Sequence, residues 1–177
     1  LLDFKFIRGV EPSHDSIIKA KSEIKPLIIE GMFDKHMFES EKFDIVTFFQ
    51  TFDHISNPNI FLKNCIRVLK KEGYILAINH NVNSFSAKIL GQKSPIFDIG
   101  HAYLYDLDTM KQIFEKNGFV VKDVFSVWNN ITLRYLLHLL PLPLKLKNVI
   151  NRILKTLKID SNIISLPLGN LGIIAQK

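Results

Sequence analysis

Hydrophobic positions along the chain alternate between short continuous apolar runs and longer stretches in which apolar residues recur every three or four positions. The clearest apolar runs cover residues 43–49 and 74–79, and both predict buried strands. Further strands are expected at residues 6–10, 26–30, 119–128 and 172–176. The stretches between them have the spacing of amphipathic helices. Strands that alternate with helices in this way predict an α/β fold with a largely parallel sheet.

Capping residues mark where several helices begin and end. Asn57 precedes a proline, which is typical of an N-cap followed by the first helical residue, and Gly73 is expected to end that helix. Asp106 is expected to cap another helix. Shorter helices are expected over residues 14–22 and 84–90, the second inside a polar stretch that is otherwise loop.

Length and composition indicate one globular domain. A chain of 177 residues can bury a full hydrophobic core without disulfides or metals. The single cysteine, Cys65, excludes a disulfide framework and a cysteine-based zinc cluster. No apolar run reaches the ~18 residues of a membrane-spanning helix, and no signal peptide opens the chain. We therefore expect a cytoplasmic protein. Because the chain begins at Leu1 without a methionine, we also expect it to be a piece of something longer.

The net charge of +6 comes from one segment. Residues 131–159 contain six basic residues and no acidic ones, whereas the rest of the chain contains 17 of each. The six are Arg134, Lys145, Lys147, Arg152, Lys155 and Lys158. Nucleic-acid binding favours basic side chains interleaved with stacking aromatics, and Tyr135 is the only aromatic residue in this segment. We therefore expect no nucleic-acid partner.

The same segment predicts a basic amphipathic helix over residues 142–159. Its apolar stripe recurs at helical spacing: Leu146, Ile150, Ile153 and Leu157. We interpret residues 131–165 as a basic helical insert, or cap, within the domain, and we expect the stripe to pack on the domain. The alternative is a peripheral membrane contact, in which the stripe rests on an anionic membrane surface.

Candidate site residues follow the predicted strands, because open α/β sheets bind ligands at the carboxyl ends of their strands. Glu11 is suited to accept hydrogen bonds from both hydroxyls of a ribose, although a carboxylate at the end of a strand more often simply caps the next helix. Met32 and Phe33 either sandwich a purine ring or pack in the core. His54, at a helix entry, is expected to be structural.

Several of these segments match motifs of a known family. Residues 9–13 (Gly-Val-Glu-Pro-Ser) resemble its second-strand motif, and residues 43–55 resemble its fourth-strand block. Residues 68–74 (Val-Leu-Lys-Lys-Glu-Gly-Tyr) are similar to its turn into the fifth strand, and residues 101–119 to its "H…F/Y…LLE-x-x-GF" segment. The chain thus resembles the small-molecule branch of the class I S-adenosylmethionine-dependent methyltransferases, over about residues 6–128 and the final strand.

The resemblance implies a Rossmann-like methyltransferase sheet, mostly parallel with an antiparallel last strand, in a domain that spans residues 1–177. The first strand and glycine-rich loop of the family have no counterpart here, which implies an N-terminally truncated domain. Residues 1–5 would then end the first helix, or residues 1–3 would be a remnant of the first strand. Because the family places its first strand between them, the strands that end at Glu11 and Phe49 should not be neighbours.

The resemblance also implies which residues bind S-adenosylmethionine. They are, in chain order, Glu11, Pro12, Gly31, Met32, Phe33, Gln50 and Thr51. Glu11 would bind the ribose, Met32 and Phe33 would flank the adenine, and Gln50 and Thr51 would line the methionine side. Asp53 stands where the family usually has Glu. Without the glycine-rich loop, we expect this chain alone to bind the cofactor weakly or not at all, and to be inactive.

Methyl transfer needs a positioned acceptor and a group that takes its proton. His80 and His101 are the candidate catalytic bases, because both lie in segments expected to border the strand ends. An amine or an acidic hydroxyl could instead lose its proton to water. No His, Asp and Glu residues have the spacing of metal ligands, so no metal is expected.

We therefore predict an S-adenosylmethionine-dependent methyltransferase that acts on a small-molecule acceptor. A sugar or glycan precursor is the first expectation for the acceptor, and a quinone-like or lipid acceptor is the second. The alternative is a non-catalytic methyltransferase-like binding module or an inactive fragment. A nicotinamide-dependent enzyme would share the acidic residue at a strand end, but it does not account for residues 43–55.

Overall fold

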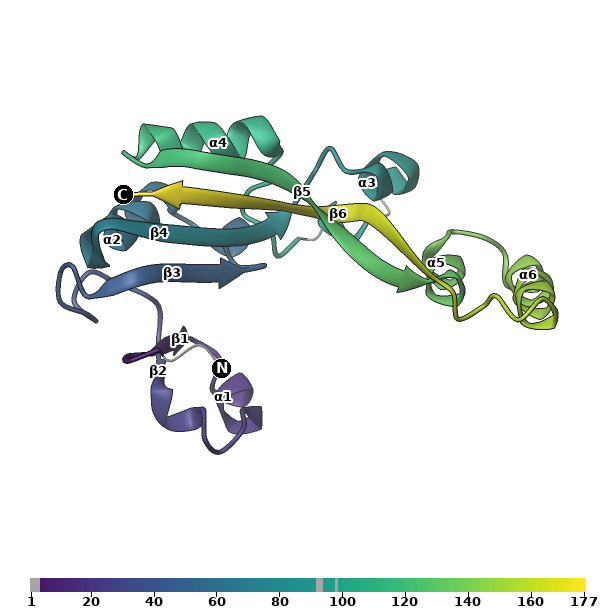
Figure 1. Ribbon diagram of the computed structural model, residues 1–177, viewed down its shortest axis with the longest axis horizontal. Coiled ribbons are helices and arrows are strands. Elements are labelled where there is room, and N and C mark those ends of the chain that lie inside the picture. The colour runs from purple at the N-terminus through teal and green to yellow at the C-terminus, as the bar shows by residue number, and fades with distance from the viewer. Residues whose placement is uncertain (1–3, 92–93, 98) are drawn as a thin grey trace.

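The computed structural model of the chain describes residues 4–91, 94–97 and 99–177. Its main body is a four-stranded sheet with the strand order β3-β4-β6-β5 (Figure 1). Strands β3 (Phe43–Phe49) and β4 (Leu69–His80) are parallel. Strand β6 (Ile163–Gln176) runs antiparallel to both of its neighbours, β4 and β5 (Val120–Thr132). The expected α/β sheet with an antiparallel last strand is confirmed.

Two short strands lie outside this sheet. Strands β1 (Gly9–Glu11) and β2 (Ile28–Glu30) form a separate parallel pair beside helix α1 (His14–Lys19), below β3 in Figure 1. The strands that end at Glu11 and Phe49 are therefore not neighbours, as expected. The second strand is shorter than predicted, because Lys25–Leu27 forms a 3₁₀ turn around a proline that has no N–H to donate. The expectations for residues 1–3 lie outside the described residues.

Helices α2 (Pro58–Val68) and α4 (Leu107–Lys116) pack their apolar residues into one core on one face of the sheet. The predicted caps are present. The Asn57 side chain accepts a hydrogen bond from the backbone N–H of Ile60, and Asp106 forms a capping box with Thr109. The fully buried core side chains include Phe52, Leu62, Cys65, Ile75, Met110, Phe114, Leu171 and Ile173. The opposite face of β3 leaves Ile45 and Phe49 half exposed.

Gly73 does not end a helix, contrary to our prediction. Helix α2 stops at Val68 and β4 begins at the next residue, Leu69. A Cβ atom on Gly73 would lie 3.0 Å from the carbonyl oxygen of Lys70 and 3.1 Å from that of Asp44. The pairing of β3 with β4 shifts register at the same place. Glycine is therefore needed here because two backbone segments approach closely at a bulge.

Strands β5 and β6 extend as a two-stranded ribbon beyond the rest of the sheet (Figure 1). Both are longer than predicted, because Pro167 and Gly169 lie inside β6 and do not form a loop. The register shifts there, between the pairs Val127–Asn170 and Asn129–Leu166, and a bulge of this kind tolerates a proline. Helix α3 (Phe85–Leu90) lies near the start of the ribbon, and the predicted helix at this position is confirmed.

The far end of the ribbon carries helices α5 (Leu133–Leu139) and α6 (Leu144–Thr156). The predicted basic amphipathic helix is present, but its predicted packing on the domain is wrong. No residue of α6 is buried, and Leu146, Ile153 and Leu157 of its stripe are 44%, 51% and 61% exposed. The helix contacts α5, which lies at the same end of the ribbon. The ribbon is long enough to hold both helices away from the sheet (Figure 1).

Candidate functional site

The site is centred on Asp53, which follows β3 in the 3₁₀ turn Phe52–His54. The preceding residue, Phe52, is fully buried and holds this turn to the core. Its ring centroid lies 5.1–5.9 Å from the rings of Phe48, Phe61, Tyr105 and Phe114. This anchoring leaves Asp53 only 1% exposed at the carboxyl end of the strand.

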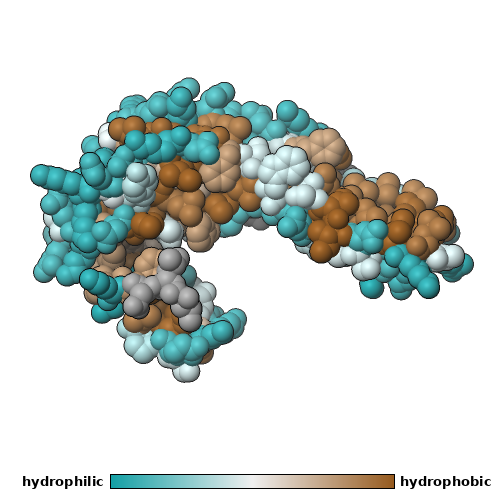
Figure 2. All heavy atoms as spheres, in the orientation of Figure 1, coloured by the Kyte–Doolittle hydropathy of each residue, from teal (hydrophilic) through white to brown (hydrophobic). Residues whose placement is uncertain are grey.

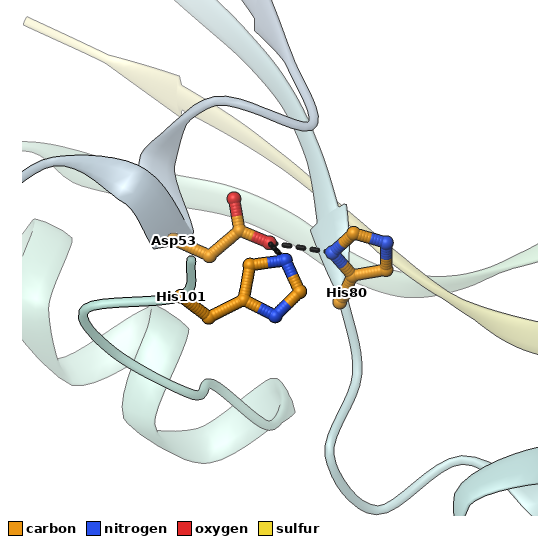
Figure 3. A group of neighbouring side chains, drawn as sticks. All are labelled: Asp53, His80 and His101. Atoms are coloured by element: carbon orange, nitrogen blue, oxygen red, sulfur yellow. Dashed lines mark hydrogen bonds and ion pairs between the residues drawn. The ribbon is translucent and has the colours of Figure 1, made fainter. Parts of the chain in front are cut away.

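Three histidines surround the Asp53 carboxylate. His80, the last residue of β4, places Nδ1 2.5 Å from Oδ2 of Asp53. His101 places Nε2 3.5 Å from the same oxygen, and Figure 3 shows both rings converging on it. His54 places Nε2 3.9 Å from Oδ1. The 101–103 segment is fixed to this position, because the backbone N–H groups of Ala102 and Tyr103 donate to the carbonyl oxygen of Asp53.

The hydrogen bonds decide which nitrogen of each histidine carries a proton. His101 Nδ1 lies 2.8 Å from the carbonyl oxygen of Ile96, and His54 Nδ1 lies 2.9 Å from that of Gly100. A carbonyl oxygen only accepts, so both Nδ1 atoms are donors. His80 instead donates its Nδ1 proton to Asp53, which leaves the Nε2 lone pair on the side of the ring away from the carboxylate (Figure 3). Among the described residues, His80 Nε2 has no hydrogen-bond partner.

Asp53 is held as a carboxylate. Burial acts to raise its pKa, but the hydrogen bond from His80 and the charges of His80, His101 and His54 outweigh burial, so the pKa lies below its usual value. An ionised Asp53 keeps the Nδ1 proton on His80. The pair therefore has the geometry of a general base that is oriented by a carboxylate.

Asp53, His80 and His101 could also be considered as metal ligands, since one atom from each lies within 4.8 Å of the others. Zinc binds its ligand atoms at about 2.0–2.2 Å in tetrahedral geometry, which separates the ligand atoms by more than the 2.5 Å between His80 Nδ1 and Asp53 Oδ2. The two atoms as placed share a proton. The expectation that the site binds no metal remains a prediction.

Buried polar atoms without hydrogen-bond partners surround the same strand end. Within the described part of the chain, they include Asp53 Oδ1, both amide atoms of Asn79 and the hydroxyl of Tyr105. Burial, followed by the charges of Tyr103 and Asp53, raises the pKa of Tyr105, so its hydroxyl stays protonated. Buried polar atoms are normally satisfied by protein, water or ligand, so this strand end has unused hydrogen-bonding capacity.

The candidate cofactor residues at the first two strand ends are only partly available. Glu11 uses Oε1 to accept a hydrogen bond from the backbone N–H of Ser13 at 2.8 Å, and Pro12 lies between these two residues. Gly31 adopts a positive φ of 143° and donates its N–H to the carbonyl oxygen of Glu11. The structure therefore brings Glu11 and Gly31 together, as the pairing of Glu11 with Glu30 requires.

Met32 and Phe33 differ in their surroundings. The Met32 side chain is 64% exposed and free to contact a ligand. The Phe33 ring instead lies 5.6 Å from that of Phe61 and 6.3 Å from that of Phe38, as a core residue would. Phe33 therefore packs as a core residue, and a purine contact by Met32 stays a prediction.

Gln50 has the clearest unused hydrogen-bonding capacity among the candidate cofactor residues. It adopts a φ of 51° at the end of β3, and its N–H donates to the carbonyl oxygen of Ile78 at 2.8 Å. Its side-chain Oε1 is buried and has no partner among the described residues. The hydroxyl of the next residue, Thr51, donates to the carbonyl oxygen of Phe49. A donor group of a bound cofactor would satisfy Gln50 Oε1, so this strand end fits S-adenosylmethionine.

The sequence interpretation identified His80 and His101 but did not place Asp53, Asn79 or Tyr105 in the site. Asp53 carried a usable signal, because it lies four residues after the end of a strand and is next to His54. Asn79 and Tyr105 carried none, since an asparagine at a strand end and a tyrosine in a polar loop are both common surface residues.

A family model described as "Methyltransferase domain" matches residues 4–124 of the chain. The chain belongs to this methyltransferase domain family. The match includes both halves of the Asp53–His80 pair and the His101 segment. It also confirms the resemblance to class I S-adenosylmethionine-dependent methyltransferases, the fold of which continues beyond the matched range into β6.

The methyltransferase domain is similar to two curated proteins, both named ubiquinone biosynthesis O-methyltransferase. The one from Glaesserella parasuis is 24% identical over 97 residues, which are 48% of this chain and 41% of that protein. The one from Bradyrhizobium diazoefficiens is 32% identical over 89 residues, which are 47% of this chain and 35% of that protein. The chain thus matches less than half the length of these relatives.

A solved structure has the same fold over most of the methyltransferase domain. A putative methyltransferase from Bacillus halodurans aligns with a TM-score of 0.62 and 19% identity, and the alignment covers 98% of this chain and 83% of that one. Within the described residues, no helix is long and apolar enough to cross a membrane.

Proposed function

We propose that this domain transfers a methyl group from S-adenosylmethionine to a hydroxyl group of a small molecule, with His80 as the general base. The observation that carries the proposal is the Asp53–His80 hydrogen bond at the carboxyl ends of β3 and β4. It leaves one imidazole nitrogen with a lone pair, oriented by a buried carboxylate, at the edge of the sheet where this class of fold binds ligands.

S-adenosylmethionine, when bound, supplies a methyl carbon bonded to a positively charged sulfur. His80 Nε2 takes the proton of the acceptor hydroxyl as its oxygen forms a bond to that carbon, and the carbon–sulfur bond breaks with its electron pair on sulfur. The products are the methyl ether, S-adenosylhomocysteine and a protonated His80. Asp53 stabilises the imidazolium through its hydrogen bond to Nδ1, and solvent then removes the proton, because His80 is 26% exposed.

His101 has a different role in this proposal. Its Nδ1 proton is engaged by the Ile96 carbonyl, and its Nε2 faces Asp53 at 3.5 Å in a side chain that is only 5% exposed. Neither nitrogen is directed to an acceptor molecule. Its charge, placed 3.5 Å from Oδ2, is one of the causes that lower the pKa of Asp53, so we assign His101 as a positioning residue beside the base.

The names of the relatives favour an aromatic hydroxyl over a sugar as the acceptor. Both are named for ubiquinone biosynthesis, and ubiquinone precursors carry ring hydroxyls. This supports our second expectation, the quinone-like acceptor, and leaves the sugar or glycan precursor as the competing substrate. A ring hydroxyl is more acidic than a sugar hydroxyl, so a single histidine base is better matched to it.

The proposal is tested with the full-length gene product, radiolabelled S-adenosylmethionine and two acceptor panels, one of catechols with hydrophobic tails and one of sugar nucleotides. We expect label in the catechol products and no loss of activity after treatment with a chelator. Label in the sugar panel would move the acceptor class to sugars. If the chelator abolished activity and added zinc restored it, Asp53, His80 and His101 would be assigned as metal ligands. No transfer together with no cofactor binding would indicate the non-catalytic binding module instead.

Cofactor binding provides a separate prediction. Glu11→Gln retains the oxygen that accepts from Ser13 N–H but removes the charge available to ribose hydroxyls. Charge-assisted hydrogen bonds contribute more than neutral ones, so we expect calorimetry on the full-length gene product to show at least about tenfold weaker S-adenosylmethionine binding, equivalent to ~1.4 kcal/mol. Glu39→Gln, at an exposed surface pair with Lys42, is the matched control and should bind normally. Equal affinities for both variants would remove Glu11 from the binding site.

A further inference from the structure

The end of the β5–β6 ribbon presents an apolar surface that the domain does not cover. Helices α5 and α6 lie there, beyond the four-stranded sheet, and Figure 2 shows brown side chains gathered on this end with teal ones along its edge. The base of this part is well fixed, since Leu133 N–H donates to the carbonyl oxygen of Asn162 and Arg134 N–H to that of Asp160. We call residues 133–163 the arm.

The exposed apolar side chains of the arm form one face of α6 and continue onto its neighbours. Leu146, Val149, Ile153 and Leu157 recur at spacings of three and four residues, and they are 44–61% exposed. The other large exposed apolar residues of the arm are Tyr135, Leu139, Leu144 and Ile163. A contiguous exposed patch of this kind marks an interaction surface, because soluble proteins rarely leave one uncovered.

Basic side chains border the same face of α6. At 100° per residue, Lys145 and Arg152 project to one side of the Leu146–Leu157 stripe and Lys147 to the other. Lys147 donates to the carbonyl oxygen of His138. In the described structure, none of the six basic residues in the 131–159 segment forms an ion pair with a carboxylate. That segment contains no acidic residue. The charge of the arm is therefore available to an external anion.

We propose that the arm docks on the surface of an anionic phospholipid bilayer. The apolar face of α6 enters the boundary between headgroups and acyl chains, and the bordering Lys and Arg side chains contact lipid phosphates. This occupant satisfies both properties of the surface at once. A second copy of the chain would bring two arms of like charge together, and a nucleic acid would leave the apolar face uncovered. The proposal does not depend on the proposed function.

Vesicle sedimentation tests the proposal with the chain as it exists. We expect it to sediment with vesicles of equal parts phosphatidylcholine and phosphatidylglycerol, to remain in solution with phosphatidylcholine alone, and to be released as salt is raised. The quadruple variant Lys145→Glu, Arg152→Glu, Lys155→Glu, Lys158→Glu should bind at least about tenfold more weakly. The double variant Val149→Asp, Ile153→Asp should lose binding to a similar degree, and circular dichroism confirms that each variant is folded.

A matched control separates docking by the arm from a general effect of charge. Lys19→Glu, Lys21→Glu, Lys63→Glu and Lys122→Glu change the net charge by the same amount at exposed positions outside the arm. This control should still bind. Equal loss in the control and arm variants, or unchanged binding of the Val149→Asp, Ile153→Asp variant, would overturn the proposal. Light scattering that shows a dimer disrupted by the same double variant would assign the face to a second copy.

Discussion

In the full-length gene product, Asp53→Asn is expected to lower the rate of methyl transfer about 10²–10⁴-fold. This is the range that a positioned general base contributes. Asparagine has almost the same size as aspartate, but its carboxamide oxygen is neutral and its nitrogen donates. It therefore cannot stabilise a protonated His80 or fix the His80 tautomer as the carboxylate does at 2.5 Å. The measurement is the turnover number at saturating cofactor, with S-adenosylmethionine affinity determined by calorimetry.

A matched substitution and a rescue experiment separate catalysis from folding. Asp44→Asn removes a carboxylate on β3, the strand that precedes Asp53, and it should leave turnover within about twofold. The Asp44 side chain is 78% exposed and pairs with Lys70. His80→Ala should lose activity as Asp53→Asn does, and added imidazole should restore part of it, because the His80 side chain is partly exposed. Full activity of a folded Asp53→Asn variant, or failure of imidazole to rescue His80→Ala, would exclude the assigned base.

The lowered pKa of Asp53 also makes the effect of Asp53→Asn on the free energy of unfolding depend on pH. Because the folded state holds this pKa below its value in the unfolded chain, the ionised carboxylate stabilises the fold above the unfolded pKa of ~3.9. That contribution is lost as the pH falls through the folded pKa. The difference in unfolding free energy between the native protein and Asp53→Asn should therefore be greatest at neutral pH and should shrink in acid.

The parts of the fold that could be predicted from the sequence are those with strong local signals. Strand Phe43–Phe49 matched its prediction to the residue, because five of its seven residues are large and apolar and the run ends at Gln50. Helix α4 matched because Asp106 and Thr109 form a reciprocal capping box. At both places the backbone hydrogen bonds, the side-chain capping and the burial of apolar residues favour the same conformation.

Local signals failed where a distant segment determines the conformation. Gly73 and Pro167 both have the local properties of loop residues, yet each lies in a strand at a point where the register with its partner shifts. The partner strand comes from another part of the chain, so nothing near either residue in the sequence indicates it. The exposed stripe of α6 is a third example, since amphipathicity predicts a helix with an apolar face but not the surface that covers it.

The site was only partly predictable, because some of its residues are positioned by distant segments of the chain. His80 is the last residue of a well-defined strand, so its position at the sheet edge could be inferred. The pairing with Asp53 could not, because it depends on where the turn Phe52–His54 is held by the core. His101 reaches the same carboxylate only through its hydrogen bond to Ile96 and the backbone bonds from residues 102 and 103 to Asp53. A polar loop of this length has no periodicity that would reveal these contacts.

Phe52→Ala is expected to lower the free energy of unfolding by about 3–5 kcal/mol, the cost of removing a buried phenylalanine and leaving a cavity. Phe52 is fully buried and its ring contacts four other aromatic rings, which come from β3, α2, α4 and the segment before α4. No single neighbour can fill the space that it leaves. A small domain is stable by only ~5–15 kcal/mol, so this loss removes a large part of the total. The measurement is urea unfolding followed by circular dichroism.

Two further variants keep this prediction specific. Phe85→Ala removes the same ring from α3, where it is 63% exposed, and should cost less than about 1 kcal/mol. Phe52→Leu retains most of the apolar volume, so its free energy of unfolding should lie between those of the two alanine variants. Equal stabilities of Phe52→Ala and Phe85→Ala would show that the turn is not held by its phenylalanine. Because Asp53 is the next residue along the chain, a loosened turn would also displace the carboxylate from His80. Phe52→Leu should therefore reduce turnover even where most of the free energy of unfolding is retained.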